Sequence, residues 1–277
     1  MKRDRKPWWP ALAVNGLLAV IAILALFPLF WMVSVSFMRP GEADSFPPPL
    51  LPSAPSLTAY KDLFAHQGRG RDFANSLVLA TAATLLSLTF NVAAGYAFAK
   101  LRFAGRERMF QLLLGTLVIP GQVAMIPLFL MLKPLGLVNN FGGVLVPAAA
   151  GVFGIFLVRQ YAFSIPDELL EAARVDGAGE FRIFRSIVLP VLTPIMVTLA
   201  TFTFLASWND FMWPLIVLSN DHLYTLPVAL ASLSREHAQD SELMMAGAVV
   251  TVGPVLLLFV VLQRYYIRGL LAGSVKG

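Results

Sequence analysis

Residues 11–37 read ALAVNGLLAVIAILALFPLFWMVSVSF, and no side chain in this run is ionisable. A helix that crosses ~30 Å of hydrocarbon needs about 20 such residues. The run follows the basic segment Met1–Lys6, as in a secretory signal peptide, and Ser34 and Ser36 imitate a small-residue cleavage site. The apolar region of a signal peptide is only about 7–15 residues long. We therefore expect a retained first transmembrane helix.

Five further long apolar runs follow along the 277-residue chain. Hydrophobic residues make up 57% of the sequence and charged residues 13%, about half the charged fraction of a soluble domain. This low charge indicates that most of the surface faces lipid. We predict an all-α, polytopic membrane protein with six transmembrane helices, folded as a single domain over residues 1–277 without internal repeats. The predicted spans are 11–37, 76–99, 110–132, 141–161, 187–207 and 243–262.

Lysine and arginine are distributed unequally between the two sides of these spans. One side carries Lys2, Arg3, Arg5, Lys6, Lys100, Arg102, Arg106, Arg108, Arg159, Arg174, Arg182, Arg185, Arg264, Arg268 and Lys276. The other side carries Arg39, Lys61, Arg69, Arg71, Lys133 and Arg235. Positive residues are retained in the cytoplasm. The more basic side is therefore predicted to be cytoplasmic, with both termini inside.

Two long connections lie on the predicted outer side. The first, residues 38–75, contains Pro47, Pro48 and Pro49, which favour extended backbone. The second covers residues 209–242. Either connection is expected to be a solvated connector or a contact for a partner outside the membrane.

Several functional classes are disfavoured by what the sequence lacks. There is no cysteine, hence no disulfide or thiolate metal site. The basic residues form no continuous stripe, which argues against nucleic-acid binding. His66, His222 and His237 lie in outer connections, and no nucleophile–base or metal-binding pattern occurs. We predict no catalytic residue and no metal site.

The apolar runs also contain no Asp, Glu or His. Ion-coupled secondary transporters usually carry ionisable relay groups at membrane depth, although backbone carbonyls can hold Na⁺ without them. That class of transporter stays open as the alternative function. The sequence has no phosphate-binding loop, so a protein that uses ATP here requires a separate chain to bind the nucleotide.

The cytoplasmic connection between the fourth and fifth spans, about residues 164–186, contains a predicted short helix. Ser164 and Asp167 have the spacing of a capping box, and Pro166 suits a first turn. Gly177 and Gly179 provide a stop. The helix has two physical interpretations: a peg that docks in the groove of a partner, or an amphipathic connector on the lipid surface.

The spacing of residues in this connection distinguishes the two. Glu171-Ala172-Ala173, three residues, Gly177, nine residues and Ile187-Val188-Leu189-Pro190 match the EAA-x3-G-x9-I-x-L-P motif. The motif resembles the coupling loop of permease subunits in bacterial ATP-binding-cassette importers. The chain is similar to the carbohydrate branch, and within it to the shorter, maltose-transporter-type permease. The stretches that carry this similarity are Pro120–Pro127, Trp208–Leu215 and Arg268–Gly277.

The resemblance implies a non-catalytic permease of the bacterial inner membrane that imports a sugar or oligosaccharide. It implies three partners: a second, unlike permease, a cytoplasmic ATPase dimer that binds ATP and Mg, and an extracytoplasmic solute-binding protein. The permease itself is expected to bind no cofactor. The residues implied in coupling to the ATPase are Glu171, Ala172, Ala173, Asp176 and Gly177.

Polar and aromatic residues at membrane depth indicate a substrate path. Pro120-Gly121 interrupts the third span, and Gln122 is the nearest polar side chain, although neighbouring helices can also satisfy such a kink. Asn91 is a second polar group at depth, able either to face substrate or to bond a neighbouring helix. Aromatic rings stack on sugars and polar groups bond hydroxyls, but tryptophan also anchors at interfaces. The remaining candidates at the outer end of the fifth span are Trp208, Asn209, Asp210 and Trp213.

Overall fold

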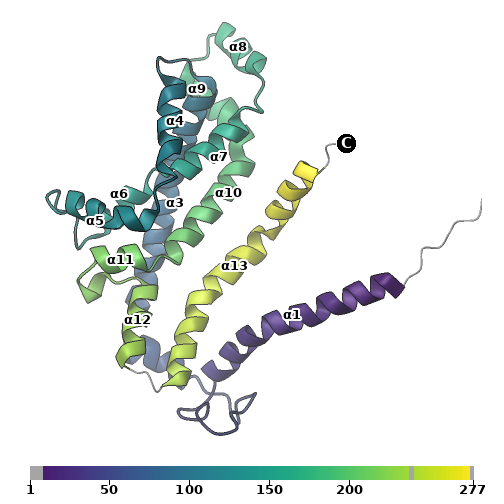
Figure 1. Cartoon of the computed structure of the whole chain (residues 1–277), viewed down its shortest axis with the longest axis vertical. Coiled ribbons are helices and arrows are strands. Elements are labelled where there is room, and N and C mark those ends of the chain that lie inside the picture. Colours follow the sequence, from purple (N-terminus) through teal and green to yellow (C-terminus); the bar gives the residue numbers. More distant parts are fainter. Residues whose placement is uncertain (1–8, 237–239, 275–277) are drawn as a thin grey trace, which may run out of the picture. The chain divides into compact units, whose positions relative to one another are not determined.

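The computed structural model describes residues 9–236 and 240–274, with only the backbone described at 9–11, 235, 236 and 262–274. Every regular element in the described residues is helical, as predicted (Figure 1). The elements are α1 (Trp9–Ser36), α2 (Thr58–Lys61), η1 (Asp62–His66), α3 (Arg69–Lys100), α4 (Arg106–Thr116), α5 (Gly121–Leu132), α6 (Phe141–Ala148), α7 (Val152–Ala162), α8 (Asp167–Val175), α9 (Glu180–Ile183), η2 (Phe184–Val188), α10 (Leu189–Trp208), α11 (Met212–Val217), η3 (Asp221–Leu223), α12 (Leu226–Glu236) and α13 (Ser241–Ser274).

Internal contacts group the chain into two compact units. Unit 1 comprises residues 1–69 and 230–253, and unit 2 comprises residues 70–229 and 254–277. The two units are described separately below. The assignment of the whole chain to one domain stays a prediction.

Five stretches are long and apolar enough to cross a membrane: 12–36, 69–100, 141–162, 180–208 and 241–261. The pair α4 and α5 makes a sixth if it is counted as one span bent by 105°. Five of the six predicted spans therefore correspond to such stretches, with different ends, and the predicted third span corresponds to the bent pair. The fifth begins at Glu180 rather than at 187, because α9, η2 and α10 follow one another without a gap. The terminal basic residues used to orient the chain lie outside the described side chains.

The bend between α4 and α5 confirms the predicted interruption at Pro120-Gly121. Pro120 precedes α5 with extended backbone (φ −58°, ψ 130°), and proline has no amide hydrogen to continue a helix. Pro127, by contrast, lies inside α5 without ending it. A second interruption, at residues 149–151 between α6 and α7, was not predicted. There Gly151 is extended (φ −98°, ψ 131°), and its amide donates to Asn91 Oδ1 at 3.0 Å.

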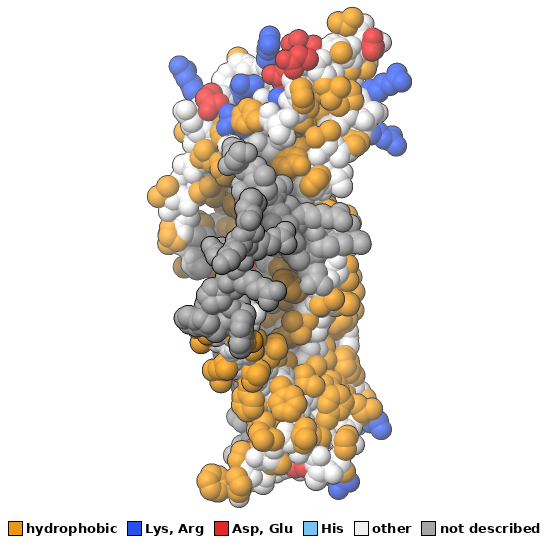
Figure 2. Space-filling view, turned by 90° about the vertical axis from the view of Figure 1, so that its right-hand side faces the viewer, with side chains coloured by type: hydrophobic (Ala, Val, Ile, Leu, Met, Phe, Trp, Pro, Cys, Tyr) orange, Lys and Arg blue, Asp and Glu red, His pale blue; other side chains and the backbone are white. Residues whose placement is uncertain are grey.

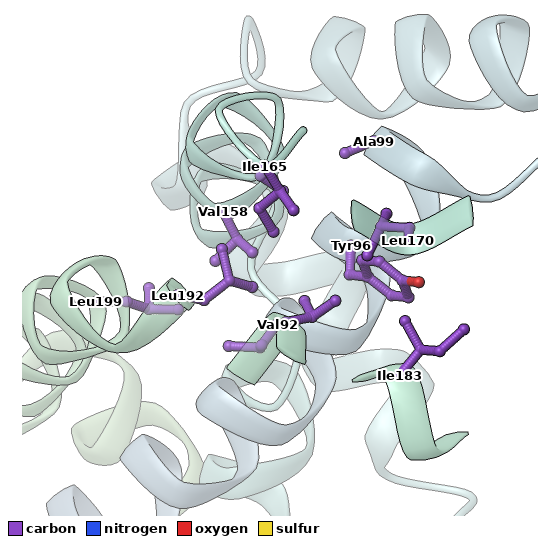
Figure 3. Packing of buried hydrophobic residues seen from close by; sticks show 11 residues of the cluster. Val92, Tyr96, Ala99, Val158, Ile165, Leu170, Ile183, Leu192 and Leu199 are labelled. Carbon is purple, nitrogen blue, oxygen red and sulfur yellow. The ribbon is translucent and has the colours of Figure 1, made fainter. Parts of the chain in front are cut away.

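The main core of unit 2 joins α3, α7, α8, α9 and α10 (Figure 3). Val158 and Leu192 are fully buried at its centre, and Gly95 of α3 allows close approach of α7. A Cβ atom added to Gly95 would lie 2.6 Å from Val158 Cβ. Tyr96, Leu170 and Ile183 extend the same core to the end of the unit that carries α8. The predicted short helix α8 (Asp167–Val175) is therefore packed on the spans by its own apolar side.

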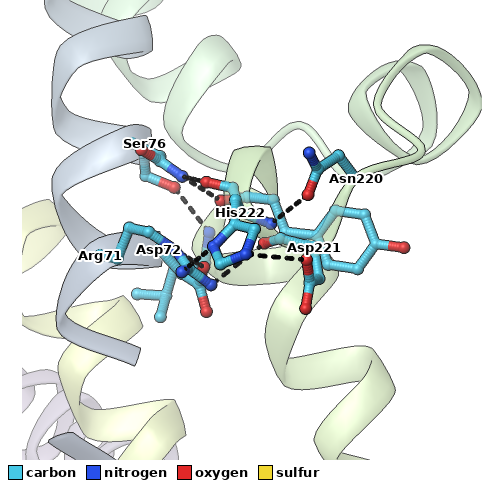
Figure 4. A network of polar contacts seen from close by, with 9 residues as sticks. Arg71, Asp72, Ser76, Asn220, Asp221 and His222 are labelled. Atoms are coloured by element: carbon cyan, nitrogen blue, oxygen red, sulfur yellow. Dashed lines mark hydrogen bonds and ion pairs between the residues drawn. The ribbon is translucent and has the colours of Figure 1, made fainter. Parts of the chain in front are cut away.

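The second outer connection, residues 209–242, is not a simple solvated connector. It contains α11, η3 and α12, and Trp213 and Val217 of α11 are buried against α5 and α6. A polar network ties the segment to the start of α3 (Figure 4). Arg71 bonds the ring of His222, and Asn75 Nδ2 donates to the carbonyls of His222 and Tyr224, both at 3.0 Å.

The first outer connection lies in unit 1. As predicted, its proline-rich part has no helix, whereas α2 and η1 occupy residues 58–66. The Glu42 carboxylate accepts from the amides of Arg39 at 3.0 Å and Ser53 at 2.6 Å. Glu242 at the start of α13 is buried and accepts from the Ala43 amide at 2.9 Å. Two carboxylates thus fix the backbone of this loop.

Candidate functional site

The α8 platform, defined as residues 164–183, presents one buried and one exposed side. Leu170 is 1% exposed and packs with Tyr96 and Ile183 (Figure 3). On the other side, Glu171 and Ala172 are exposed. In Figure 2, Lys, Arg, Asp and Glu side chains gather at the end of unit 2 that carries α8.

Two large apolar side chains of the platform are also exposed. Val175 at the end of α8 is 89% exposed and Phe181 in α9 is 76% exposed. The exposed surface of the platform therefore combines charged and large apolar side chains.

The C-terminus of α8 forms a Schellman motif. The Ala178 amide donates to the Ala173 carbonyl and the Gly177 amide to the Arg174 carbonyl, both at 3.0 Å. Gly177 has φ +80°, a left-handed conformation that glycine adopts without cost. This geometry explains why glycine stands at the fixed position of the motif. Ala173, half-buried, and Ala178 both pack against the unit 2 core.

The N-terminus of α8 differs from the prediction. The Ser164 hydroxyl donates to the Tyr161 carbonyl at 2.7 Å, and the helix begins after Pro166 without a side-chain cap. The predicted capping box is therefore wrong, because Ser164 is bonded to the end of α7 instead. Lys100 at the end of α3 fixes this end of the helix. Its Nζ donates to the Ile165 carbonyl at 2.6 Å and to Asp167 Oδ1 at 2.7 Å.

Electrostatics at the two ends of α8 agree with these contacts. The hydrogen bond from Lys100 and its positive charge hold the pKa of Asp167 below its usual range. Arg174 Nε donates to Glu180 Oε1 at 2.6 Å, and this bond raises the pKa of Arg174. Tyr96 of α3 donates to the other oxygen of Glu180 at 3.3 Å. Side chains from α3 thus hold the platform at both ends.

Arg159 of α7 is a buried residue beside the platform. In the sequence it served only to predict the orientation of the spans. Its Nη2 donates to Glu107 at 2.8 Å and its Nε to the Phe98 carbonyl at 3.2 Å. The guanidinium carbon lies 3.8 Å from the ring centre of Phe110 and 4.9 Å from that of Phe163. One cation therefore links α3, α4 and α7 near the cytoplasmic-side ends predicted for these helices.

The second candidate site is a cavity of about 430 Å³ within unit 2. Its wall comes from α3, α6, α7, α10 and α11, together with the break at residues 149–151. Non-helical backbone at membrane depth is tolerated where it lines a cavity. The polar lining residues are Ser87, Asn91, Thr203, Ser207 and Asp210, and the aromatic ones are Phe153, Phe202 and Trp213.

Asn91 connects the helices around this cavity. Its Nδ2 donates to Ser87 Oγ at 2.7 Å, and its Oδ1 accepts from the Gly151 amide. Ser87 in turn bonds Thr203 of α10 at 3.2 Å. A Cβ atom added to Gly154 would lie 2.4 Å from Asn91 Nδ2. Asn91 thus lines the cavity and also satisfies the broken backbone.

Asp210 and Trp213 lie at the start of α11. The Trp213 amide donates to Asp210 Oδ1 at 3.3 Å, and the Trp213 indole N–H donates to the Gly143 carbonyl at 3.0 Å. Burial raises the pKa of the Asp210 carboxyl, and the backbone amides of Trp213 and Met212 partly oppose the shift. The cavity therefore combines an aromatic ring with a carboxylate.

The other predicted path residues lie elsewhere. Gln122 is exposed at the start of α5 and does not line the cavity. Trp208 is fully buried, with rings of Phe73 and Phe204 centred 5.5 and 5.9 Å away. Asn209 is exposed, and its Nδ2 donates to the Leu205 carbonyl at 2.8 Å. Ser87, Thr203 and Ser207 were missed, since hydroxyl residues are common in apolar spans and none stands out in the sequence.

Residues 91–271, which include the α8 platform and most of the cavity lining, match the family model described as the binding-protein-dependent transport system inner membrane component. The chain belongs to this family. It is thus a multi-pass membrane permease subunit of a binding-protein-dependent, ATP-binding-cassette importer, as the coupling-loop motif predicted.

Relatives of this permease cover its whole length. It is 38% identical over 284 residues, 100% of each chain, to the arabinooligosaccharides transport system permease protein AraQ of Halalkalibacterium halodurans. It is 33% identical to the lactose transport system permease protein LacG of Rhizobium radiobacter, over 96% of this chain and 97% of the relative. Among solved structures, it is similar to a chain of a bacterial ABC transporter involved in the import of the acidic polysaccharide alginate. The TM-score is 0.84, at 25% identity over 96% of this permease and 99% of that chain.

Proposed function

We propose that this permease is one half of the membrane channel of an oligosaccharide importer, and that its α8 platform docks on a separate ATPase. The observation that carries the coupling role is the two-sided geometry of α8. One side is fixed to the spans through Leu170 and Lys100, while Glu171, Ala172 and Val175 are exposed. When a partner moves a helix that is fixed in this way, the helix can transmit the movement to the spans without unfolding.

The other partners follow from the same proposal. A second, unlike permease completes the channel, and an extracytoplasmic binding protein delivers the cargo. The platform faces the cytoplasm, and ATP and Mg are bound by the ATPase dimer. When ATP closes that dimer, α8 moves with it and the spans rotate as rigid bodies to open the path outward. This permease performs no hydrolysis and binds no metal.

The cargo proposal draws support from the cavity and from the relatives. The Trp213 ring and the polar groups around it suit a sugar, because aromatic faces stack on sugar rings and polar groups bond hydroxyls. AraQ and LacG are named for arabino-oligosaccharides and lactose, whereas the alginate transporter carries an acidic polysaccharide. Family membership therefore favours a saccharide and leaves the charge of the cargo open.

Uptake by reconstituted vesicles tests this function. The permease is assembled with its cognate ATPase, second permease and binding protein, and labelled arabinotriose, lactose and maltotriose are offered separately. We expect uptake of at least one saccharide that requires ATP and persists when an ionophore abolishes ion gradients. Uptake that collapses with the ionophore and ignores ATP depletion would instead support an ion-coupled secondary transporter. ATP-driven uptake of none of the three would contradict the oligosaccharide assignment.

A further inference from the structure

The charge of the cavity wall is unbalanced. Of the residues that line it, Asp210 alone is ionisable, and no Lys, Arg or His is among them. Within the described part of the chain, no ion pair includes Asp210 (its carboxylate accepts from the backbone amide of Trp213). A carboxylate has about four acceptor positions, so the backbone amides of Trp213 and Met212 leave capacity for further donors.

The neighbouring polar groups are more fully engaged. Asn91 uses its amide nitrogen and oxygen on Ser87 and Gly151. The indole N–H of Trp213 is bonded to the Gly143 carbonyl, so this residue offers a ring face rather than a donor. Asp210 is consequently the strong acceptor of the cavity. Sugar hydroxyls are donors that match it, whereas phosphate and carboxylate groups are repelled.

A helix cap is the simpler role for Asp210, since its side chain accepts from an amide in the first turn of α11. The cap requires only an oxygen acceptor, which asparagine also provides. The negative charge requires the carboxylate. Replacement by asparagine therefore separates the two roles.

We propose that Asp210 determines charge specificity: its carboxylate makes the cavity accept uncharged, polyhydroxylated cargo and reject anionic cargo. This inference rests on the proposed function and narrows its substrate class to neutral oligosaccharides.

The natural absence of cysteine allows a direct test. Ser207→Cys places one thiol in the cavity lining, in the assembled transporter held in detergent so that both faces are accessible. The probes are two methanethiosulfonates of similar size, one with a trimethylammonium group and one with a sulfonate group. The ratio of their labelling rates is measured with Asp210 present and in the Ser207→Cys, Asp210→Asn double variant.

We expect the cation-to-anion rate ratio to fall roughly tenfold when Asp210 is replaced by asparagine, because a charge in a low-dielectric cleft concentrates ions of opposite sign. An unchanged ratio would overturn the proposal, as would failure of both probes to react, since the cavity would then be closed to solutes. The assay does not depend on uptake. A changed ratio without saccharide uptake would defeat the proposed function and leave the charge specificity standing.

Discussion

The α8 platform and the cavity are both within unit 2, yet they are built in opposite ways. The platform is one continuous segment whose key features, Leu170, Ala173 and Gly177, belong to a single helix and its cap. The cavity takes its wall from five helices and one backbone break. A local element can be recognised in the sequence as a motif with fixed spacing, whereas a cavity wall assembled from distant segments cannot. The platform should therefore be sensitive to backbone conformation, and the cavity to helix spacing.

Gly154→Ala tests the cavity side of this comparison and should have the largest effect. The added Cβ would lie 2.4 Å from Asn91 Nδ2 and 3.0 Å from Leu199 Cδ1. Overpacking of this kind costs about 1–3 kcal/mol. We expect a lower thermal unfolding midpoint and a loss of ATP-driven uptake of at least about tenfold.

Gly115→Ala in α4 is the matched control, because nothing lies within 4 Å of its added Cβ. Its midpoint and uptake should stay close to those of the wild type. Equal behaviour of the two variants would show that the spacing between α3 and α7 does not set the cavity.

Gly177→Asp tests the platform side. At φ +80° a side chain strains the backbone by about 1–2 kcal/mol, and a new charge is placed beside the exposed surface of α8. We expect uptake per ATP hydrolysed to fall about fivefold while the amount of permease in the membrane is unchanged.

Gly177→Asn has the same size and also tolerates the left-handed region, so it isolates the charge. If uptake per ATP hydrolysed falls less in this variant than in the Asp variant, the difference is due to electrostatics at the docking surface. Normal coupling in the Asp variant would speak against any docking role for this turn.

Asn91→Ala should have a smaller effect on stability. It removes the donor to Ser87 within α3 and the acceptor of the Gly151 amide. A hydrogen bond between helices, such as the one to Gly151, contributes about 1 kcal/mol in membranes. The thermal midpoint should fall by a few degrees. Thr89→Ala on an exposed part of α3 is the control, and an equal shift in both variants would remove Asn91 from its bridging role.

Lys100→Met should have the smallest effect on stability, because Asp167 is largely exposed and water screens its ion pair. Since Lys100 lowers the pKa of Asp167 in the folded state, the pair stabilises the fold above the unfolded pKa of an aspartate. That contribution disappears as the pH falls through the lowered pKa. Thermal midpoints of the two proteins should therefore converge in acid, and a constant difference would contradict the ion pair.

Much of the fold and of the platform could be predicted from the sequence. Long apolar runs indicate spans, so five were found as single stretches and the sixth as the bent pair α4 and α5. The break at Pro120 follows from its missing amide hydrogen. The ends of the spans were less predictable. The fifth span begins at the charged residue Glu180, because α9, η2 and α10 follow one another without a gap. The end of α8 at Gly177 was also predicted correctly, because glycine adopts the left-handed conformation of a helix cap without strain.

The cavity shows where sequence reasoning fails. Three of the residues predicted for a substrate path, Asn91, Asp210 and Trp213, line the cavity, and their contact with substrate stays a prediction. Trp208 has the same composition signal but faces Phe73 and Phe204 in the core. Which face of a helix turns to a cavity depends on packing between distant segments. No sequence pattern within one apolar run therefore predicts which face of that helix lines a cavity.

The docking of α8 on an ATPase is tested most directly by cross-linking from a single cysteine. Ala172→Cys places a thiol on the exposed side of α8 in a chain without other cysteines, and Leu51→Cys, 63% exposed in the first outer connection, is the control. In the assembled transporter, a bifunctional maleimide reagent should join position 172, and not position 51, to the ATPase subunit. A thiol at 172 that stays accessible to water-soluble reagents throughout ATP turnover and never cross-links to the ATPase would contradict the account.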